Sequence, residues 1–110
     1  MLRVDQFSKE LVEGICNVLK DNVISIIVYG SVARGMQTDE SDIDVALIIK
    51  NGLDSDSEDK LSDVVVDLNL KYDKVFSVID IDGKEFEKWG ETSPFYRNVK
   101  KEGIVIWKAA

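Results

Sequence analysis

The chain has 110 residues, enough for one domain with a real hydrophobic core and little room for a second module. Its 45% hydrophobic and 32% charged residues are ordinary for a globular protein, while a net charge of −7 argues against nucleic acid as a partner, because phosphate backbones are held mainly by Lys and Arg. No apolar run is long enough to span a membrane, and one cysteine with no histidine excludes an internal disulfide and the commonest zinc ligand, so we expect a cytoplasmic protein.

The hydrophobic pattern predicts helices and strands in alternation. Phe7, Leu11 and Ile15 recur every fourth residue, which predicts an amphipathic helix from about Val4 to Lys20. The β-branched run Val23–Tyr29 is typical of a strand that is buried on both faces. The remaining predicted elements are a short helix over Val32–Met36, a strand over Asp42–Ile49, a helix from a cap at Ser57 or Asp59 to about Tyr72, a strand over Val75–Ile81, a helix over Lys84–Trp89, a helix from Ser93-Pro94 to about Lys101 and a strand over Ile104–Trp107.

The residues that carry chemistry lie where the first predicted strand ends and the second begins. The first strand ends at Gly30 and Ser31, and after ten further residues the second opens with Asp42 and Asp44. Because residues in a strand alternate faces, these two carboxylates point the same way and repel each other. A hard divalent cation relieves such repulsion, and Mg²⁺ typically binds one or two carboxylates together with substrate phosphates. The Gly-Ser turn adds backbone N–H groups for an anion, so the pattern indicates a metal and phosphate site.

This block resembles the nucleotidyltransferase superfamily that includes DNA polymerase beta. The closer similarity is to its minimal members, small stand-alone nucleotidyltransferases often encoded beside a HEPN-family partner as toxin–antitoxin pairs. The resemblance covers nearly the whole chain in length and order of elements, and it implies the α/β nucleotidyltransferase fold, with a mixed sheet of about four strands and packed helices, as a single domain over residues 1–110. The residues that carry it are Gly30-Ser31, Ala33-Arg34-Gly35 and Ser41-Asp42-Ile43-Asp44.

The resemblance also implies an activity: Mg²⁺-dependent transfer of a nucleotidyl group, AMP from ATP, to a hydroxyl. Asp42 and Asp44 would be the catalytic metal ligands, while Gly30 and Ser31 would hold the β and γ phosphates. Arg34 would steady the triphosphate, although a solvated helix residue is an equally good interpretation. The implied acceptor is a hydroxyl of the HEPN partner, which the modification silences, so that the chain acts as an antitoxin.

The third carboxylate of the family is the weak point of the match. Active members place another acid on the next strand, facing the first two, and here that position falls near Ser77. Asp80 is the predicted catalytic substitute; it lies three residues further on, on the opposite face of a regular strand, and a bulge would have to rotate it inward. Asp82 has no better claim, because it lies at the strand end beside a glycine turn.

The non-acidic residue Ser77 at this position motivates a second hypothesis for the function. In that interpretation the chain is a catalytically degenerate nucleotidyltransferase fold that neutralises its partner by binding alone. A third interpretation, one subunit of a small-molecule nucleotidyltransferase, needs an acceptor pocket from another chain. The sequence leaves both a homo-oligomer and a hetero-oligomer open.

Overall fold

The computed structural model describes residues 2–36 and 42–110. Their hydrogen bonding defines five α-helices, one short 3₁₀ helix and four strands within this part of the chain. In chain order these are α1 (Val4–Leu19), η1 (Lys20–Asn22), β1 (Val23–Tyr29), α2 (Gly30–Ala33), β2 (Ile43–Ile49), α3 (Ser55–Tyr72), β3 (Phe76–Asp82), α4 (Gly83–Trp89), α5 (Pro94–Glu102) and β4 (Ile104–Lys108).

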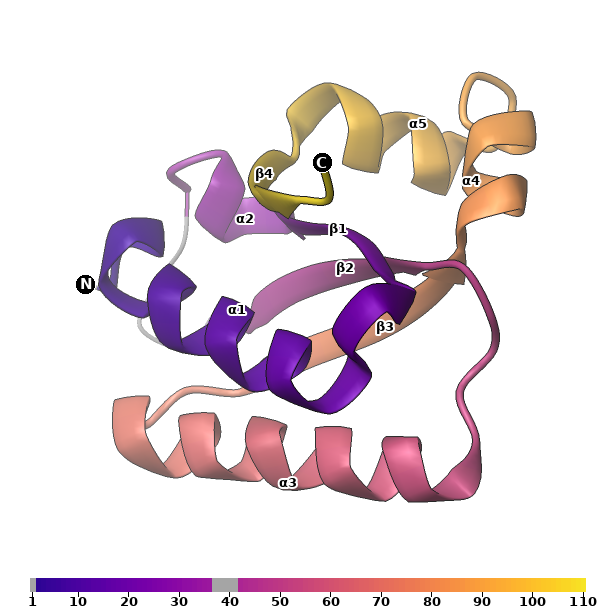
Figure 1. Ribbon diagram of the computed structural model, residues 1–110. Helices are drawn as coiled ribbons and strands as arrows, with labels where there is room; N and C mark the ends of the chain where they lie inside the picture. Colours follow the sequence, from indigo (N-terminus) through magenta and orange to yellow (C-terminus); the bar gives the residue numbers. More distant parts are fainter. Residues whose placement is uncertain (1, 37–41) are drawn as a thin grey trace.

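The strands form one mixed sheet in the order β3-β2-β1-β4 (Figure 1). Strand β1 pairs antiparallel with both β2 and β4, and β2 pairs parallel with β3. A parallel pair needs a connection that returns across the sheet, and α3 makes that return between β2 and β3. The predicted α/β class, with a mixed sheet of about four strands, is confirmed.

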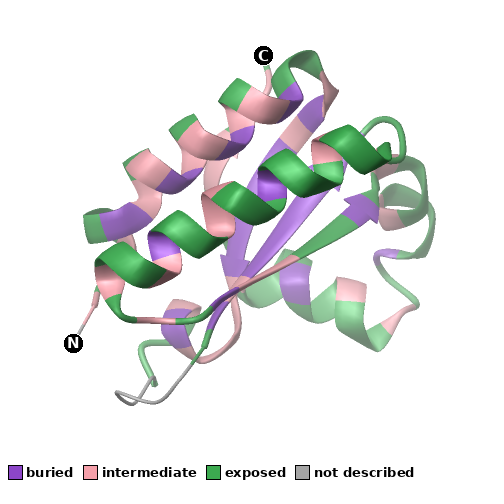
Figure 2. Ribbon diagram, turned by 90° about the horizontal axis from the view of Figure 1, so that it is seen from below, coloured by how far each residue is buried: buried purple, intermediate pink, exposed green. Residues whose placement is uncertain are grey.

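Helices cover the sheet on both faces. Helices α1 and α3 lie against one face, and α4 and α5 lie against the other (Figures 1 and 2). Along β2, Val45 and Leu47 belong to the core on the α1–α3 side, whereas Ala46 and Ile48 belong to the core on the α4–α5 side. All four side chains are 2% exposed or less. This two-sided burial explains why the central strands are apolar without alternation.

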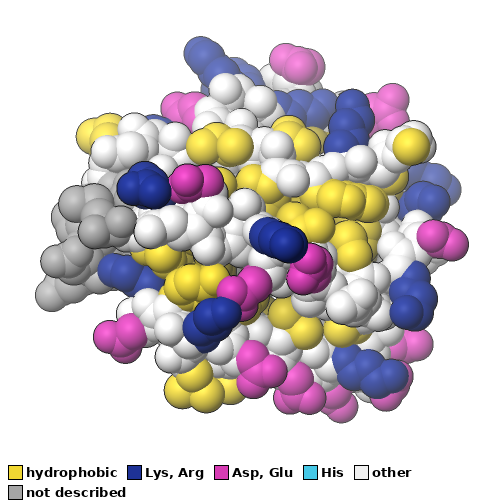
Figure 3. Space-filling view, turned by 60° about the vertical axis from the view of Figure 1, so that its left-hand side comes forward, with side chains coloured by type: hydrophobic (Ala, Val, Ile, Leu, Met, Phe, Trp, Pro, Cys, Tyr) yellow, Lys and Arg dark blue, Asp and Glu magenta, His cyan; other side chains and the backbone are white. Residues whose placement is uncertain are grey.

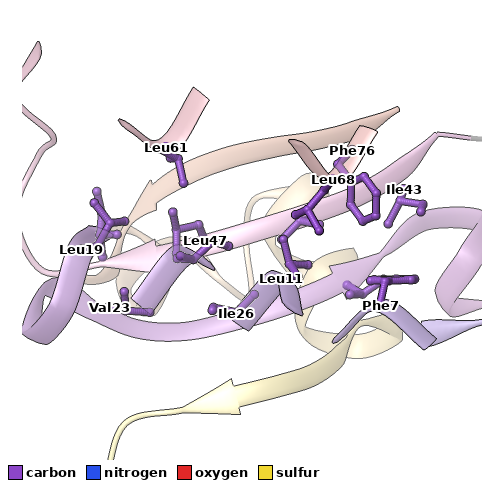
Figure 4. Packing of buried hydrophobic residues seen from close by; sticks show 14 of the residues in the cluster. Phe7, Leu11, Leu19, Val23, Ile26, Ile43, Leu47, Leu61, Leu68 and Phe76 are labelled. Atoms are coloured by element: carbon purple, nitrogen blue, oxygen red, sulfur yellow. The ribbon is translucent and has the colours of Figure 1, made fainter. Parts of the chain in front are cut away.

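The larger core lies between the sheet and the pair α1–α3 (Figure 4). Phe7 and Leu11 of α1 are fully buried, as their four-residue spacing predicted. The ring of Phe7 meets that of Phe76 edge to face, with centroids 5.3 Å apart. Aromatic pairs in this geometry stabilise a core by about 0.5–1.5 kcal/mol beyond their buried area. This contact joins α1 to the edge strand β3.

Helix α3 begins earlier than its sequence predicted. Its N-cap is Asp54, whose Oδ1 accepts a hydrogen bond of 2.7 Å from the backbone N–H of Ser57. The predicted cap at Ser57 or Asp59 is wrong, because this segment holds several residues that can cap and the first of them is used. The prediction for α5 is confirmed: Ser93 caps it and Pro94 is its first residue.

The short helix after β1 also differs from its prediction. It begins at Gly30 and ends at Ala33, and it does not continue to Met36. Gly35 follows with a φ of +70°, a left-handed conformation that ends a helix. The first helical residue is therefore the turn glycine itself.

The outer surface is chemically mixed. The face in Figure 3 has hydrophobic side chains gathered over its middle and acidic side chains along its lower margin. Within the described ranges, none of the helices combines the length and the apolar character that crossing a bilayer requires.

Candidate active site

The turn glycine and the second aspartate are in direct contact. In the β1–β2 register Tyr29 lies opposite Asp44, so Gly30, the next residue, lies beside that carboxylate. A Cβ atom added to Gly30 would lie less than 3.0 Å from Asp44 Oδ2, closer than real Cβ contacts come. Gly30 also has a φ of +77°, where side-chain-bearing residues are strained. Both the space and the backbone conformation require glycine here.

Asp42 and Asp44 form a repelling pair at the start of β2. Asp42 is exposed and Asp44 is half-buried. Burial raises the pKa of Asp44, the charge of Asp42 raises it further, and the nearby Arg34 guanidinium lowers it. The protein therefore holds a carboxylate where its negative charge is unfavourable. A bound cation would remove that cost.

The segment after Gly30 is folded back on itself as a single helical turn. The backbone N–H of Arg34 donates to the Gly30 carbonyl at 3.1 Å, and that of Met36 donates to the Ser31 carbonyl at 2.9 Å. The N-cap residue Tyr29 makes no side-chain capping bond. The first N–H groups of a helix have no acceptor within it, so those that follow Gly30 are free of helical bonds beside Asp44. They can donate to phosphate oxygens.

Arg34 is fixed over this turn by an acid from the far end of the chain. Its Nη1 lies 3.1 Å from Oε2 of Glu102, the last residue of α5, and both side chains are about half exposed. Sequence reasoning missed this ion pair, because no local pattern links residues 68 positions apart. The pair follows from the packing of α5 beside α2. It keeps a guanidinium near enough to lower the pKa of Asp44.

An aromatic side chain, also missed from sequence, borders the carboxylates. Tyr29 lies across from Asp44 on the neighbouring strand, and its ring meets that of Phe95 edge to face at 5.5 Å. Burial raises the pKa of the Tyr29 hydroxyl, and the charge of Asp44 raises it further. The hydroxyl therefore remains protonated near neutral pH and can act as a donor toward the site.

Ser77 occupies the position where a third acid was sought. It lies opposite Asp44 in the parallel β2–β3 register and is half-buried. Registered residues on neighbouring strands share a face, so its hydroxyl lies on the side of the aspartates. Over residues 2–36 and 42–110, no three His, Cys, Asp or Glu side chains are grouped so as to hold a metal ion. Among the described residues, therefore, no third carboxylate lies close enough to share a metal ion with Asp42 and Asp44.

The structure does not bring Asp80 to the aspartates. It lies opposite Leu47, and the β2–β3 register runs from Ile43 to Ile49 without a shift. The bulge that would rotate it inward is therefore absent, and this part of the prediction is wrong. Asp80 is exposed and lines a groove on the α3 side together with Glu58. A continuous parallel ladder fixes the alternation of faces, which leaves Asp80 on the opposite side of the sheet.

Two other predicted positions have a clear outcome. Asp82 caps α4, because its Oδ1 accepts hydrogen bonds from the backbone N–H groups of Lys84 and Glu85 at 2.8 and 3.1 Å. Ser41, part of the motif that carries the family resemblance, lies outside the described residues.

The family is decided by comparison with known proteins. The family model described as "Polymerase beta, Nucleotidyltransferase" matches residues 13–110. This chain is a nucleotidyltransferase of that family. The resemblance seen in its glycine turn and aspartate pair is thereby confirmed.

Two curated relatives are similar in sequence. "Putative protein adenylyltransferase MJ0604" of Methanocaldococcus jannaschii is 35% identical over 99 residues, which cover 90% of this chain and 93% of that protein. "Putative protein adenylyltransferase MJ0141" of the same organism is 32% identical over 78 residues, which cover 71% of this chain and 79% of that protein. The nucleotidyltransferase is thus similar along most of its length to proteins of this description.

Solved structures share the fold at lower identity. One chain from a "toxin-antitoxin with AMP-PNP" superposes with a TM-score of 0.60 at 18% identity, covering 93% of this chain and 73% of that one. Another, from a tri-AMPylated Shewanella oneidensis HEPN toxin in complex with an MNT antitoxin, gives a TM-score of 0.55 at 15% identity and covers 94% and 72%. These likenesses show a common fold.

The family's reaction uses a nucleoside triphosphate and a divalent metal ion, and the residues present fit such an ion. Asp42, which directly precedes β2, and Asp44 within it would supply oxygen ligands, and burial together with the charge of Asp42 raises the pKa of Asp44. The close approach of Gly30 leaves open the space that a side chain would fill. These residues therefore fit one divalent ion, which the two carboxylates would hold beside the Gly30 turn.

Proposed function

We propose that this nucleotidyltransferase transfers AMP from ATP to a hydroxyl of a partner protein of the HEPN family and so acts as an antitoxin. The observation that carries the proposal is the contact between the Gly30 turn and the Asp44 carboxylate, which would bring phosphate donors and metal ligands side by side. Support for a protein acceptor comes from the two relatives described as protein adenylyltransferases. Support for a HEPN acceptor comes from the related fold found in the complex of an AMPylated HEPN toxin.

The proposed reaction exchanges a phosphoanhydride bond of ATP for a phosphoester bond to the acceptor. The acceptor oxygen forms a bond to the α-phosphorus of ATP, the bond from that phosphorus to the bridging oxygen breaks, and pyrophosphate leaves. The hydroxyl proton is released to solvent. Mg²⁺, held by Asp42 and Asp44, would supply positive charge at the reacting phosphate.

The other residues of the site position the triphosphate. The N–H groups after Gly30 and the Ser31 hydroxyl donate to the β and γ phosphate oxygens, as a tight turn with free donors can. Arg34, held by Glu102, offers its remaining N–H groups to the same oxygens. The Tyr29 and Phe95 rings border the aspartates and limit the access of water from that side.

The test is transfer of label from [α-³²P]ATP to a HEPN-family protein from the same genome. With Mg²⁺ present, we expect the partner to gain AMP, seen as radioactivity and as a mass increase by intact mass spectrometry. The double variant Asp42→Asn, Asp44→Asn should abolish the transfer. Asp80→Asn is the matched control, because it removes a carboxylate from the same sheet on the opposite face. Absence of label with wild-type protein at saturating ATP and Mg²⁺ would refute the proposal.

A second candidate function is neutralisation of the partner by binding alone. The observation that favours it is Ser77, which faces Asp44 where a third acid was sought. The variant Ser77→Asp separates the two candidates, because it adds the missing carboxylate. If the wild-type chain transfers no AMP and Ser77→Asp does, the natural protein acts by occlusion. If the wild-type chain already transfers AMP, a third carboxylate at this position is unnecessary.

A further inference from the structure

A large pocket lies on the same face of the sheet as the aspartates, toward the other ends of the strands. Its volume is about 500 Å³, within the range of pockets that bind a ligand or the anchoring side chains of a partner. Its floor is apolar and is formed by the sheet together with α4 and α5. The residues of this floor include Ile27, Ile48, Phe86 and Val99.

The rim of this pocket is positively charged, in contrast to the protein as a whole. Lys50, Lys84, Lys100 and Lys108 line it, and Glu87 is the one acid among the lining residues. The net charge of the chain is −7, so these four lysines form a local exception. An apolar floor inside a basic rim is complementary to a segment with apolar side chains flanked by carboxylates.

A row of aromatic rings joins the pocket to the aspartates. Tyr29, beside Asp44, contacts Phe95 at 5.5 Å between centroids; Phe95 contacts Tyr96 at 5.8 Å, and Tyr96 contacts Phe86 of the pocket floor at 5.6 Å. Phe95 is 39% exposed, so part of this row is open to a partner. The row continues the apolar surface of the pocket toward the candidate active site.

The spacing between the two sites suits a single protein partner. Along β1, two to five residues separate the pocket-lining positions Ile24 and Ile27 from Tyr29. At 3.3 Å per residue this is roughly 7–17 Å. A segment held in the pocket would therefore keep a hydroxyl about two to five residues away within reach of the aspartates.

We propose that this lysine-rimmed pocket docks an acidic, amphipathic segment of the acceptor protein and thereby holds the acceptor hydroxyl at Asp42 and Asp44. The inference rests on the proposed function for the identity of the acceptor. It adds a recognition rule: the acceptor carries apolar side chains flanked by Asp or Glu close to the modified hydroxyl.

Two features favour a protein segment as the occupant. The Nζ of Lys100 lies 5.0 Å from the centre of the Phe86 ring, so the charge sits directly over the apolar floor, where a flanking carboxylate would meet it. Val105 of the sheet-edge strand β4 lines the pocket and is 54% exposed, which extends the apolar surface to the open edge of the sheet. The area is thus wider than the pocket alone and suits a chain that runs along it.

The test compares the affinity of the HEPN-family acceptor protein for the wild-type chain and for two pocket variants by isothermal titration calorimetry. Lys84→Glu with Lys100→Glu should weaken Kd at least about 10-fold and flatten its dependence on salt. Val105→Asp should weaken Kd at least about 5-fold by placing a charge on the apolar surface. The matched controls are Lys9→Glu with Lys60→Glu, which reverses two exposed lysines elsewhere, and Val66→Asp, which changes an equally accessible valine of α3. The controls should leave Kd unchanged.

Binding of fluorescent mant-ATP separates this inference from the proposed function. It should be unaltered in the pocket variants, while KM for the protein acceptor rises and kcat stays the same. If no AMP is ever transferred, the proposed function fails, and the Kd comparison still decides the docking. An unchanged Kd in both pocket variants would overturn the inference. Two other results would also overturn it. If the pocket variants lose self-association in ultracentrifugation but bind the partner normally, the pocket serves a second copy of this chain. If they lose binding of dodecanoate but bind the partner normally, the pocket serves a small amphiphile.

Discussion

Replacing Gly30 by alanine tests the contact on which the site depends. The left-handed φ of +77° costs an alanine about 1–2 kcal/mol, and the new Cβ would lie less than 3.0 Å from Asp44 Oδ2 where ordinary contact begins at 3.4 Å. The carboxylate must therefore move by roughly half an ångström or more, at a further cost of about 1 kcal/mol. Because each kcal/mol lowers Tm by roughly 4–8 °C in a domain of this size, the loss is measurable by calorimetry.

The same substitution at Gly35 is the matched control. Gly35 has nearly the same backbone conformation, with a φ of +70°, but an added Cβ meets nothing within 4 Å among residues 2–36 and 42–110. Gly35→Ala should therefore be destabilised only by the strained backbone conformation, and its AMP transfer should be unchanged. Gly30→Ala should in addition lose roughly 10- to 100-fold in transfer, as displacement of a catalytic group does. In an Asp44→Ala background the extra stability cost at position 30 should vanish. Equal stability and equal transfer in Gly30→Ala and Gly35→Ala would refute the reasoning.

Three further predictions concern the acids. The pKa of Asp44 is raised in the folded state, so Asp44 stabilises the fold when protonated and loses that contribution as the pH rises through this pKa. Asp44→Asn should therefore abolish AMP transfer and raise Tm at pH 7, by only about 2–4 °C because the side chain is half-exposed. A fall in Tm would contradict this. Hydrogen bonds from Lys71 and Tyr72 lower the pKa of Glu10, so its contribution to stability is present above the unfolded pKa of 4.5 and is lost as the pH falls through the lowered pKa of the folded state. Glu10→Gln should therefore lower Tm at pH 7, and the difference from wild type should shrink in thermal scans at successively lower pH; a constant difference would contradict this. Asp80→Asn should leave kcat and KM within about twofold of wild type in the labelling assay, and a larger loss would contradict its placement on the opposite face.

Local rules were enough to predict most elements and the aspartate pair. The four-residue spacing of Phe7, Leu11 and Ile15 specified α1. Strand alternation predicts Asp42 and Asp44 on one face, and the charge of Asp42 does act on Asp44. The alignment of Ser77 with the aspartates was also obtained correctly, although from the family pattern and not from a local rule. The helix and the aspartate pair depend on nearest neighbours in the chain.

Features that depend on tertiary packing were not accessible from the sequence. The Arg34–Glu102 ion pair and the contact of Phe95 with Tyr29 exist only because α5 packs beside α2 and β1. The start of α3 was misplaced because Asp54 and Ser57 are equally good caps by residue type. The choice between them depends on where β2 ends and on the path of the chain after it. Likewise, the absence of a bulge in β3 is a property of its pairing with a neighbouring strand.

The hydrogen-bond ladder between β1 and β2 has a consequence for engineering this protein. It alone sets which side chain of β2 stands next to Gly30, and a slip by one residue would put Ile43 or Val45 there and drive a carboxylate into the hydrophobic interior. Selection for a folded, soluble product therefore enforces the same alignment that chemistry needs. A library that randomises the interior and is screened only for expression should yield survivors whose aspartates are already in place.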